Sequence, residues 1–178
     1  MEIRPLPADE AAVRRYVEEL WLPYHRELEA TVETHDLAED VDLVAEEVSF
    51  RRERLEDEDY RLWVAVDEID RDAAASDDVG LARDGTLAGF VGTEIDAAPS
   101  VFDRPDRLVI GDIFVREPYR GTGLARDLID RAAARARDGG CAELALEVGA
   151  DNERALAFYE KVGFEPFRHR MRIDLGDL

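Results

Sequence analysis

The chain has 178 residues, 46% of them hydrophobic, and its 43 acidic and 23 basic side chains give a formal net charge of -20. This length and composition allow one domain with a sizeable core, and we expect no nucleic-acid partner for so acidic a chain, because phosphates repel it. No apolar run approaches the roughly 20 residues of a membrane span, and the N-terminus lacks an apolar signal segment. We therefore expect one cytoplasmic domain, residues 1–178, with no membrane partner.

The acidic excess has two interpretations. It could attract a polyamine or another cationic substrate. It could equally be a solvated surface spread over the whole chain, suited to molar salt that screens its self-repulsion. Lys161 is the only lysine, and a lysine-poor acidic chain looks like a protein from the cytoplasm of an extreme halophile. We favour the second interpretation, so charge does not identify a substrate.

The residues that commonly bind metals form no recognisable motif. Cys141 is the single cysteine and begins an apolar strand, where a small buried side chain is expected. The three histidines are scattered along the chain, and there is no second cysteine that could complete a set of metal ligands. The sequence therefore predicts neither an internal disulfide nor a metal site.

The first half of the chain predicts alternating strands and helices. Asp9 is a suitable helix cap, and Pro23 should end or bend the helix that follows it. Asp84-Gly85 is a hairpin signal, and the charged run 51–54 should face water. The predicted elements are a strand at 2–6, a helix from 7 onward, a helix at 43–55, a strand at 60–67, an acidic surface loop at 67–80, and a strand at 86–95.

Residues 108–136 predict a strand, a glycine-rich turn and a helix. The strand is rich in β-branched and aromatic residues and ends at Pro118, and the helix runs from Leu124 to the stop at Gly139-Gly140. Gly121 and Gly123 therefore lie at a helix N-terminus, where unpaired N–H groups and the helix dipole can hold an anion. A tight connection would explain the same glycines. The phosphate-loop and dinucleotide fingerprints are both absent.

The remainder of the chain predicts two more strands and a helix between them. Residues 141–148 alternate, and this strand follows a βα unit, so it should lie parallel to the central strand. Asp151 or Asn152 caps a helix that Gly163 closes. Residues 167–175 alternate again and predict a last, half-buried strand.

Two ordered motifs carry a family resemblance. Residues 112–125, Asp-Ile-Phe-Val-Arg-Glu-Pro-Tyr-Arg-Gly-Thr-Gly-Leu-Ala, resemble the acetyl-CoA signature of the GNAT superfamily of acyl-CoA N-acyltransferases, Arg/Gln-x-x-Gly-x-Gly/Ala. Residues 146–164 resemble its second element. The likeness is close over 108–167 and holds only in outline before 108. It implies an α/β (α+β) fold, a single GNAT-like domain with a central, mixed, mostly antiparallel sheet, helices on both faces, and a parallel strand pair that forms the CoA cleft.

The resemblance also implies how acetyl-CoA is bound. The pyrophosphate would lie on the turn, and the pantetheine arm would bond the main chain of the preceding strand and Asn152. A plain helix cap is an equally good and compatible interpretation of Asn152. The implied cofactor-binding residues are Phe114, Val115, Arg120, Gly121, Thr122, Gly123, Leu124, Ala125 and Asn152.

The same resemblance implies two catalytic residues. Tyr159 matches a tyrosine that protonates the departing CoA thiolate, although without the first motif it would be taken for a core aromatic. Asp112 is the leading candidate to accept the proton of the amine. Gly111 replaces the other half of an acidic pair found in many relatives, and alternation with Ile110 could turn Asp112 toward the core. Glu94 on the neighbouring strand is the second candidate.

The function implied is an N-acetyltransferase that moves an acetyl group from acetyl-CoA to a primary amine, on a small molecule or a protein N-terminus. The alternative is an acyl-CoA-binding regulatory module without turnover. The family usually has two strands after its last helix, whereas only one is predicted here. The final strand is either missing or supplied by a partner, which leaves a homodimer possible.

Overall fold

The computed structural model describes residues 1–32, 35–67 and 85–177. The chain divides into two compact units, Met1–Glu147 and Val148–Leu178, and each unit is described by itself. The single domain expected for residues 1–178 stays a prediction. Most of the predicted acidic loop 67–80 lies outside the described residues, as does Asp84 of the hairpin signal.

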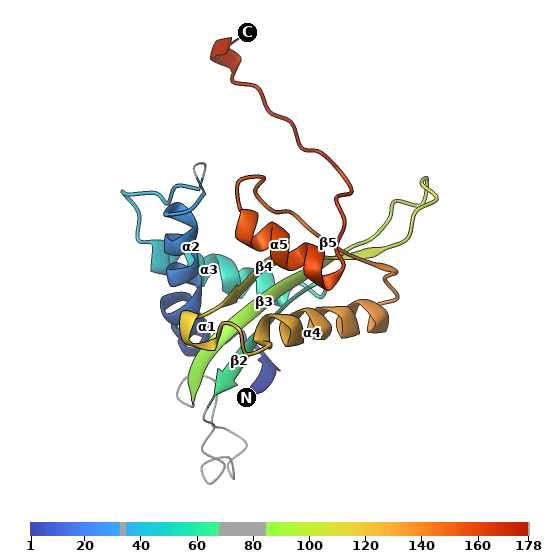
Figure 1. The fold of residues 1–178 in the computed structure, drawn as a ribbon. Helices are drawn as coiled ribbons and strands as arrows, with labels where there is room; N and C mark the ends of the chain where they lie inside the picture. Colours follow the sequence, from blue (N-terminus) through green and yellow to red (C-terminus); the bar gives the residue numbers. More distant parts are fainter. Residues whose placement is uncertain (33–34, 68–84, 178) are drawn as a thin grey trace. The chain divides into compact units, whose positions relative to one another are not determined.

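The first unit is built on a five-stranded sheet with the order β1-β2-β3-β4-β5 (Figure 1). Each neighbouring pair is antiparallel except β4 and β5, which are parallel. This mixed, mostly antiparallel sheet confirms the predicted fold class. The strands are β1 Glu2–Pro5, β2 Tyr60–Asp67, β3 Thr86–Asp96, β4 Arg107–Val115 and β5 Glu143–Leu146.

Helices lie on both faces of this sheet, with α1 and α3 on one side and α4 on the other (Figure 1). Asp9 caps α1 as predicted, because its carboxylate accepts a hydrogen bond from the Ala12 N–H at 3.0 Å. Asp42 caps α3 in the same way through the Ala45 N–H. The helices of this unit are α1 Glu10–Tyr16, the π-helix η1 Val17–Trp21, α2 Leu22–Glu29, α3 Leu43–Glu56, the 3₁₀ turn η2 Glu117–Tyr119, and α4 Leu124–Asp138.

Pro23 falls in the first turn of α2, so the first helix does not end there. The five-residue π-helix immediately before α2 widens the backbone, and the Leu22 N–H reaches back to the Val17 carbonyl. A proline lacks the N–H that a continuing α-helix needs, and a wider turn directly before it accommodates this loss. The result is a continuous but irregular helical path from α1 to α2.

The apolar core lies between the sheet and these helices. Burying a large apolar side chain contributes about 1.5–3 kcal/mol, so the face of α4 that carries Leu124, Leu128 and Ala132 is a strong anchor. On the opposite face the helical cluster packs on β2 and β3. Its fully buried members include Val13, Tyr16, Val17, Leu20, Leu62, Val64, Val66, Leu87 and Phe90.

One prediction for the charged run 51–54 was wrong. Arg51 is only 6% exposed and belongs to the face of α3 that packs on the sheet. It lies four residues after Glu47, one helical turn away, and the two side chains form an ion pair at 2.5 Å. A partnered arginine can be buried, whereas the charge pattern alone predicted solvent.

The second unit contains the helix α5, Glu153–Val162. Asn152 caps it, since its side-chain oxygen accepts from the Ala155 N–H at 3.1 Å. Gly163 ends it with φ 100°, the left-handed conformation that glycine adopts without strain. Both features confirm the helix boundaries that were predicted.

The predicted strand 167–175 was wrong, because the described residues 164–174 form neither strand nor helix and a 3₁₀ turn, η3, follows at Leu175–Asp177. The apolar half of its alternation is exposed. Alternation of apolar and polar residues gives a segment one apolar face, but it does not provide a neighbouring strand. A β-strand also requires hydrogen bonds to such a neighbour. The exposed side chains are Phe167 (72%), Met171 (91%), Ile173 (62%) and Leu175 (81%).

Candidate functional site

The strands β4 and β5 pair over only part of their length. Pairing runs from Arg107 opposite Glu143 to Ile110 opposite Leu146, while β4 continues to Val115. Beyond Ile110, therefore, the edge of β4 that faces away from β3 is not paired with β5. Phe114 lies in this stretch with Val115. Unpaired main-chain groups of a strand can bond an extended partner that lies beside it.

A β-bulge at Gly111 decides which way Asp112 faces. Thr93 of β3 pairs with Ile110 and the neighbouring Gly92 pairs with Asp112, so Gly111 is an extra residue in β4. Adjacent residues of β3 face opposite sides of the sheet, and cross-strand partners face the same side. Ile110 and Asp112 therefore face opposite sides, although they are two residues apart. The alternation argument, which placed both on one side, was wrong for this reason.

The side that Asp112 faces is the one covered by α1, α2 and α3. Thr93 marks the other side, since its hydroxyl accepts a hydrogen bond from Arg135 of α4 at 2.7 Å. Phe114, two residues beyond Asp112, packs on the helical core cluster opposite α4. Asp112 thus lies in the part of β4 that extends beyond the last residue pair with β5.

The glycine-rich turn lies between β4 and α4. Gly121 has φ 79° and Gly123 has φ 99°, so both adopt the left-handed conformation that disfavours other residues. Gly123 is the N-cap of α4, and because it has no side chain it cannot bond the first N–H groups of the helix as Asp9 does for α1. Apart from each glycine and its two chain neighbours, no atom of the described residues lies within 4 Å of a Cβ built at either position. The first N–H groups of α4 therefore begin at an open surface, which an anion could approach closely.

The Arg120 side chain is already engaged inside the protein. Its Nε donates to the Val115 carbonyl at 2.9 Å, and its guanidinium pairs with Glu27 of α2 at 2.5 Å. The same group lies over the Phe114 ring, 5.7 Å from the centroid. Arg120 thus fastens the turn to the end of β4 and to α2. The Thr122 hydroxyl similarly donates to the Tyr119 carbonyl at 2.7 Å within the turn.

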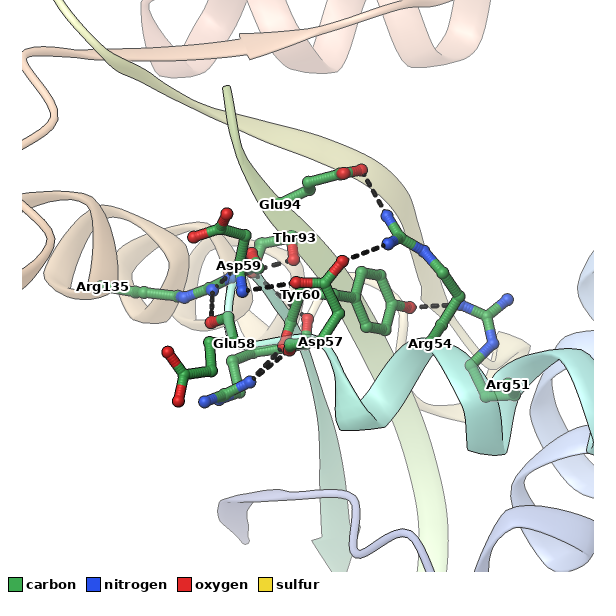
Figure 2. Close-up of polar contacts among 10 residues, drawn as sticks. Arg51, Arg54, Asp57, Glu58, Asp59, Tyr60, Thr93, Glu94 and Arg135 are labelled. Atoms are coloured by element: carbon green, nitrogen blue, oxygen red, sulfur yellow. Dashed lines mark hydrogen bonds and ion pairs between the residues drawn. The ribbon is translucent and has the colours of Figure 1, made fainter. Parts of the chain in front are cut away.

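Asp112 is surrounded by a polar group of residues on the helical side of the sheet. Burial raises the pKa of its carboxyl above the usual value, while the nearby Arg51 guanidinium and a hydrogen bond from Tyr24 oppose this rise. Arg51 in turn donates to Glu47 at 2.7 Å and to the Tyr60 hydroxyl, and Figure 2 shows the second of these contacts. Sequence reasoning missed this cluster; the i, i+4 spacing of Glu47 and Arg51 was its one local signal.

Glu94, the second candidate base, has a different setting. Its side chain is 49% exposed and forms an ion pair at 2.7 Å with Arg54, which also bonds Asp57 at 2.9 Å (Figure 2). Arg54 and Asp57 line a shallow surface hollow with Phe50 and Glu53. The Glu94 carboxylate is therefore exposed and already paired with an arginine.

Two histidines lie next to this cluster. The Nδ1 atom of His25 is 2.8 Å from the Nε2 atom of His35, and the two rings are nearly parallel. Burial, the neighbouring His35 and Arg51 lower the pKa of His25 to about 4. His25 is therefore neutral near pH 7, and it packs on the rings of Trp21 and Tyr24.

Two predicted site residues belong to the second unit. Asn152 caps α5, and Tyr159 packs with its ring centroid 5.5 Å from that of Phe158 and 5.6 Å from that of Phe164. Their roles toward CoA stay predictions. In the described ranges, no group of three or more His, Cys, Asp or Glu side chains is arranged to hold a metal ion. The helices described here include none that is long and apolar enough to cross a membrane.

The fold thus has a partly paired parallel strand pair, a bulge in β4 and a glycine-capped helix after it. The Acetyltransferase (GNAT) family model matches residues 33–164, so the chain belongs to this family. It is 40% identical over 76 residues to glucosamine 6-phosphate N-acetyltransferase of Trypanosoma brucei brucei, covering 42% of this chain and 50% of the relative. The chain spans about half the length of that curated relative.

Solved structures resemble the fold over nearly the whole chain. A tetramutant of the BH1408 protein from Bacillus halodurans has a TM-score of 0.73 at 19% identity and covers 98% of this chain and 100% of its own. An aminoglycoside N-acetyltransferase in complex with CoA has a TM-score of 0.63 at 17% identity, with 97% and 93% covered. At these identities the likeness concerns the fold alone.

Proposed function

We propose that the chain is an N-acetyltransferase that moves the acetyl group of acetyl-CoA to a primary amine by direct attack. The acceptor is a small molecule or a protein N-terminus. The observation that carries the proposal is the stretch of β4 beyond Ile110 that β5 does not pair, with the glycine-capped N-terminus of α4 following it in the chain, in a protein of the GNAT family. The proposed enzyme is cytoplasmic, and its acidic surface is suited to high salt.

In this proposal CoA is held mainly by backbone groups. The pyrophosphate lies on the turn from Gly121 to Ala125, where N–H groups and the helix dipole favour an anion. Phe114 and the Val115 N–H offer main-chain groups to the pantetheine arm, since the Val115 carbonyl already accepts from Arg120, and Asn152 offers its amide. Open space in front of Gly121 and Gly123 fits such a ligand. The Arg120 side chain, tied to Glu27 and Val115, supports the turn and leaves phosphate binding to the backbone.

The reaction then needs three proton transfers. A bound ammonium loses a proton to the Asp112 carboxylate, and the amine nitrogen attacks the acetyl carbonyl carbon. The C–S bond breaks, and the CoA thiolate takes a proton from the Tyr159 hydroxyl. The nitrogen loses its second proton as the amide forms, and this proton restores the Tyr159 hydroxyl through solvent. Asp112 is supported as the base by its place on the helical side of β4, by the nearby Arg51 cation and by the hydrogen bond from Tyr24.

The test uses Asp112→Asn, with Asp103→Asn as an exposed control on the loop before β4. Free CoA is measured with a thiol reagent after mixing acetyl-CoA with glucosamine 6-phosphate, an aminoglycoside and short peptides. The wild-type chain should release CoA with at least one of these amines. In Asp112→Asn the rate should fall about 10²–10⁴-fold while acetyl-CoA still binds.

The outcomes separate the alternatives. Full activity in Asp112→Asn would remove Asp112 as the base and leave the transferase intact. CoA binding without release by any amine would instead support an acyl-CoA-binding regulatory module. Loss of activity in Asp103→Asn as well would mean that the asparagine change acts through folding.

A further inference from the structure

Tyr24 of α2 lies directly over the strand pair next to Asp112. Its ring centroid is 5.8 Å from that of Phe90 and 5.5 Å from that of Phe114, and these two residues pair across β3 and β4. The next pair on the same face of the sheet is Gly92 with Asp112. Tyr24 is therefore held by aromatic packing at the place from which its hydroxyl donates to the Asp112 carboxylate.

A second polar group reaches the same strand pair through Tyr60 of β2. A Cβ built on Gly92 would lie 3.0 Å from the Tyr60 hydroxyl, so this glycine makes room for that oxygen opposite Asp112. Arg51 donates to Tyr60 and is fixed by two contacts to Glu47, at 2.7 and 2.5 Å. The arginine is thus a rigid, buried cation near Asp112.

Several elements packed around Asp112 contribute charged or titratable side chains. Arg51 is the cation, and Glu47 is bonded to it, so the remaining carboxylate that this cation can stabilise is Asp112. Tyr16 and Tyr60 are neutral near pH 7, because burial raises the pKa of each hydroxyl. The groups are Tyr16 of α1, Tyr24 of α2, His35 after α2, Glu47 and Arg51 of α3, and Tyr60 of β2.

We propose that Tyr24 is a positioning residue that holds the Asp112 carboxylate ready to accept the proton of the acceptor amine. The inference rests on the proposed role of Asp112 as the base. Burial works against an ionised carboxylate, and a hydrogen bond from a fixed hydroxyl favours it. Arg51 supplies the matching countercharge without contacting the amine itself.

The test compares Tyr24→Phe with Tyr16→Phe. Both changes delete one hydroxyl and keep a ring, and both rings pack against Phe90, at 5.8 and 5.1 Å. The Tyr16 hydroxyl is buried and has no hydrogen-bond partner among the described residues. Its removal therefore leaves the Asp112 carboxylate with the same bonds, which makes it the matched control.

The measurement is a carboxyl-carbon NMR titration of Asp112, whose resonance is assigned by its loss in Asp112→Asn. In Tyr24→Phe the apparent pKa of Asp112 should rise by about one unit, because a hydrogen bond to the charged form is lost. In Tyr16→Phe it should stay at the wild-type value. This readout needs no acceptor, and it works at the fixed ionic strength that so acidic a chain requires.

Kinetics provide the second readout. The base must be deprotonated, so kcat/KM rises with pH through the pKa of Asp112. In Tyr24→Phe this acid limb should move to higher pH, and kcat/KM on the limb should fall about tenfold. The control should keep the wild-type limb.

Each outcome has one meaning. An unchanged Asp112 titration in folded Tyr24→Phe overturns the inference, as does an equal shift in Tyr16→Phe. If Asp112→Asn keeps full activity, the proposed base is wrong, whatever the tyrosine variants do. If Tyr24→Phe does not fold, Tyr24→3-fluorotyrosine replaces it; its more acidic hydroxyl should move the Asp112 titration downward, and no movement refutes the inference.

Discussion

Replacing Gly123 by alanine should weaken CoA binding more than it weakens folding. Gly123 has φ 99°, and an L-residue in this left-handed region costs about 1–2 kcal/mol. For a chain of this size each kcal/mol lowers Tm by about 2–4 °C. The new methyl group would also project into the open space at the start of α4. We expect the loss of one hydrogen bond to a charged phosphate, a roughly 10- to 100-fold weaker Kd.

Gly163 gives a matched control for this experiment. Its φ is 100°, nothing described lies within 4 Å of a Cβ built on it, and it lies at the C-terminal end of α5. Gly163→Ala therefore introduces the same backbone strain without the N–H groups of a helix start. Melting curves and calorimetric titration with CoA are measured for both variants. Equal CoA affinity in Gly123→Ala and Gly163→Ala would refute the reasoning that α4 holds the pyrophosphate.

Two further predictions concern the second unit and the charge. Tyr159→Phe keeps the ring that packs on Phe158 and Phe164 but deletes the proton, so kcat should fall about 10²–10⁴-fold with acetyl-CoA binding retained. Wild-type kcat, with the chemical step shown to be limiting in single turnovers, would contradict that role. The net charge of -20 should make Tm rise with KCl, because about 1 M salt screens charges beyond roughly 3 Å. A flat Tm between dilute buffer and molar KCl would contradict the halophile interpretation.

Local signals predicted the elements of this fold well. Asp9, and either Asp151 or Asn152, were predicted as caps from residue type and position; Asp9 and Asn152 each accept the N–H three residues ahead. The apolar spacing from Leu124 predicted the buried face of α4. These features depend on neighbours within one helical turn, and for that reason sequence alone was sufficient.

The predictions that were wrong concern features that depend on residues far away in the sequence. Arg51 was expected in solvent because its neighbours are charged, yet Tyr60 of β2 and the sheet behind α3 bury it. Alternation in 167–175 predicted a strand, yet a strand also requires a ladder. Neither a burial partner nor a sheet edge can be identified from the segment itself.

The direction in which Asp112 faces depends both on the local sequence and on pairing with a distant strand. Gly111 within a strand is a local sign of a bulge, but only the pairing of Gly92 with Asp112 and of Thr93 with Ile110 fixes where the extra residue falls. Without the bulge, Asp112 would face α4 with Ile110, away from Tyr24 and Arg51. One inserted glycine therefore determines whether the carboxylate meets its hydrogen-bond donor and countercharge. Gly111 thus matters through the register of β4, since the extra residue places Asp112 opposite Gly92 on the helical side of the sheet.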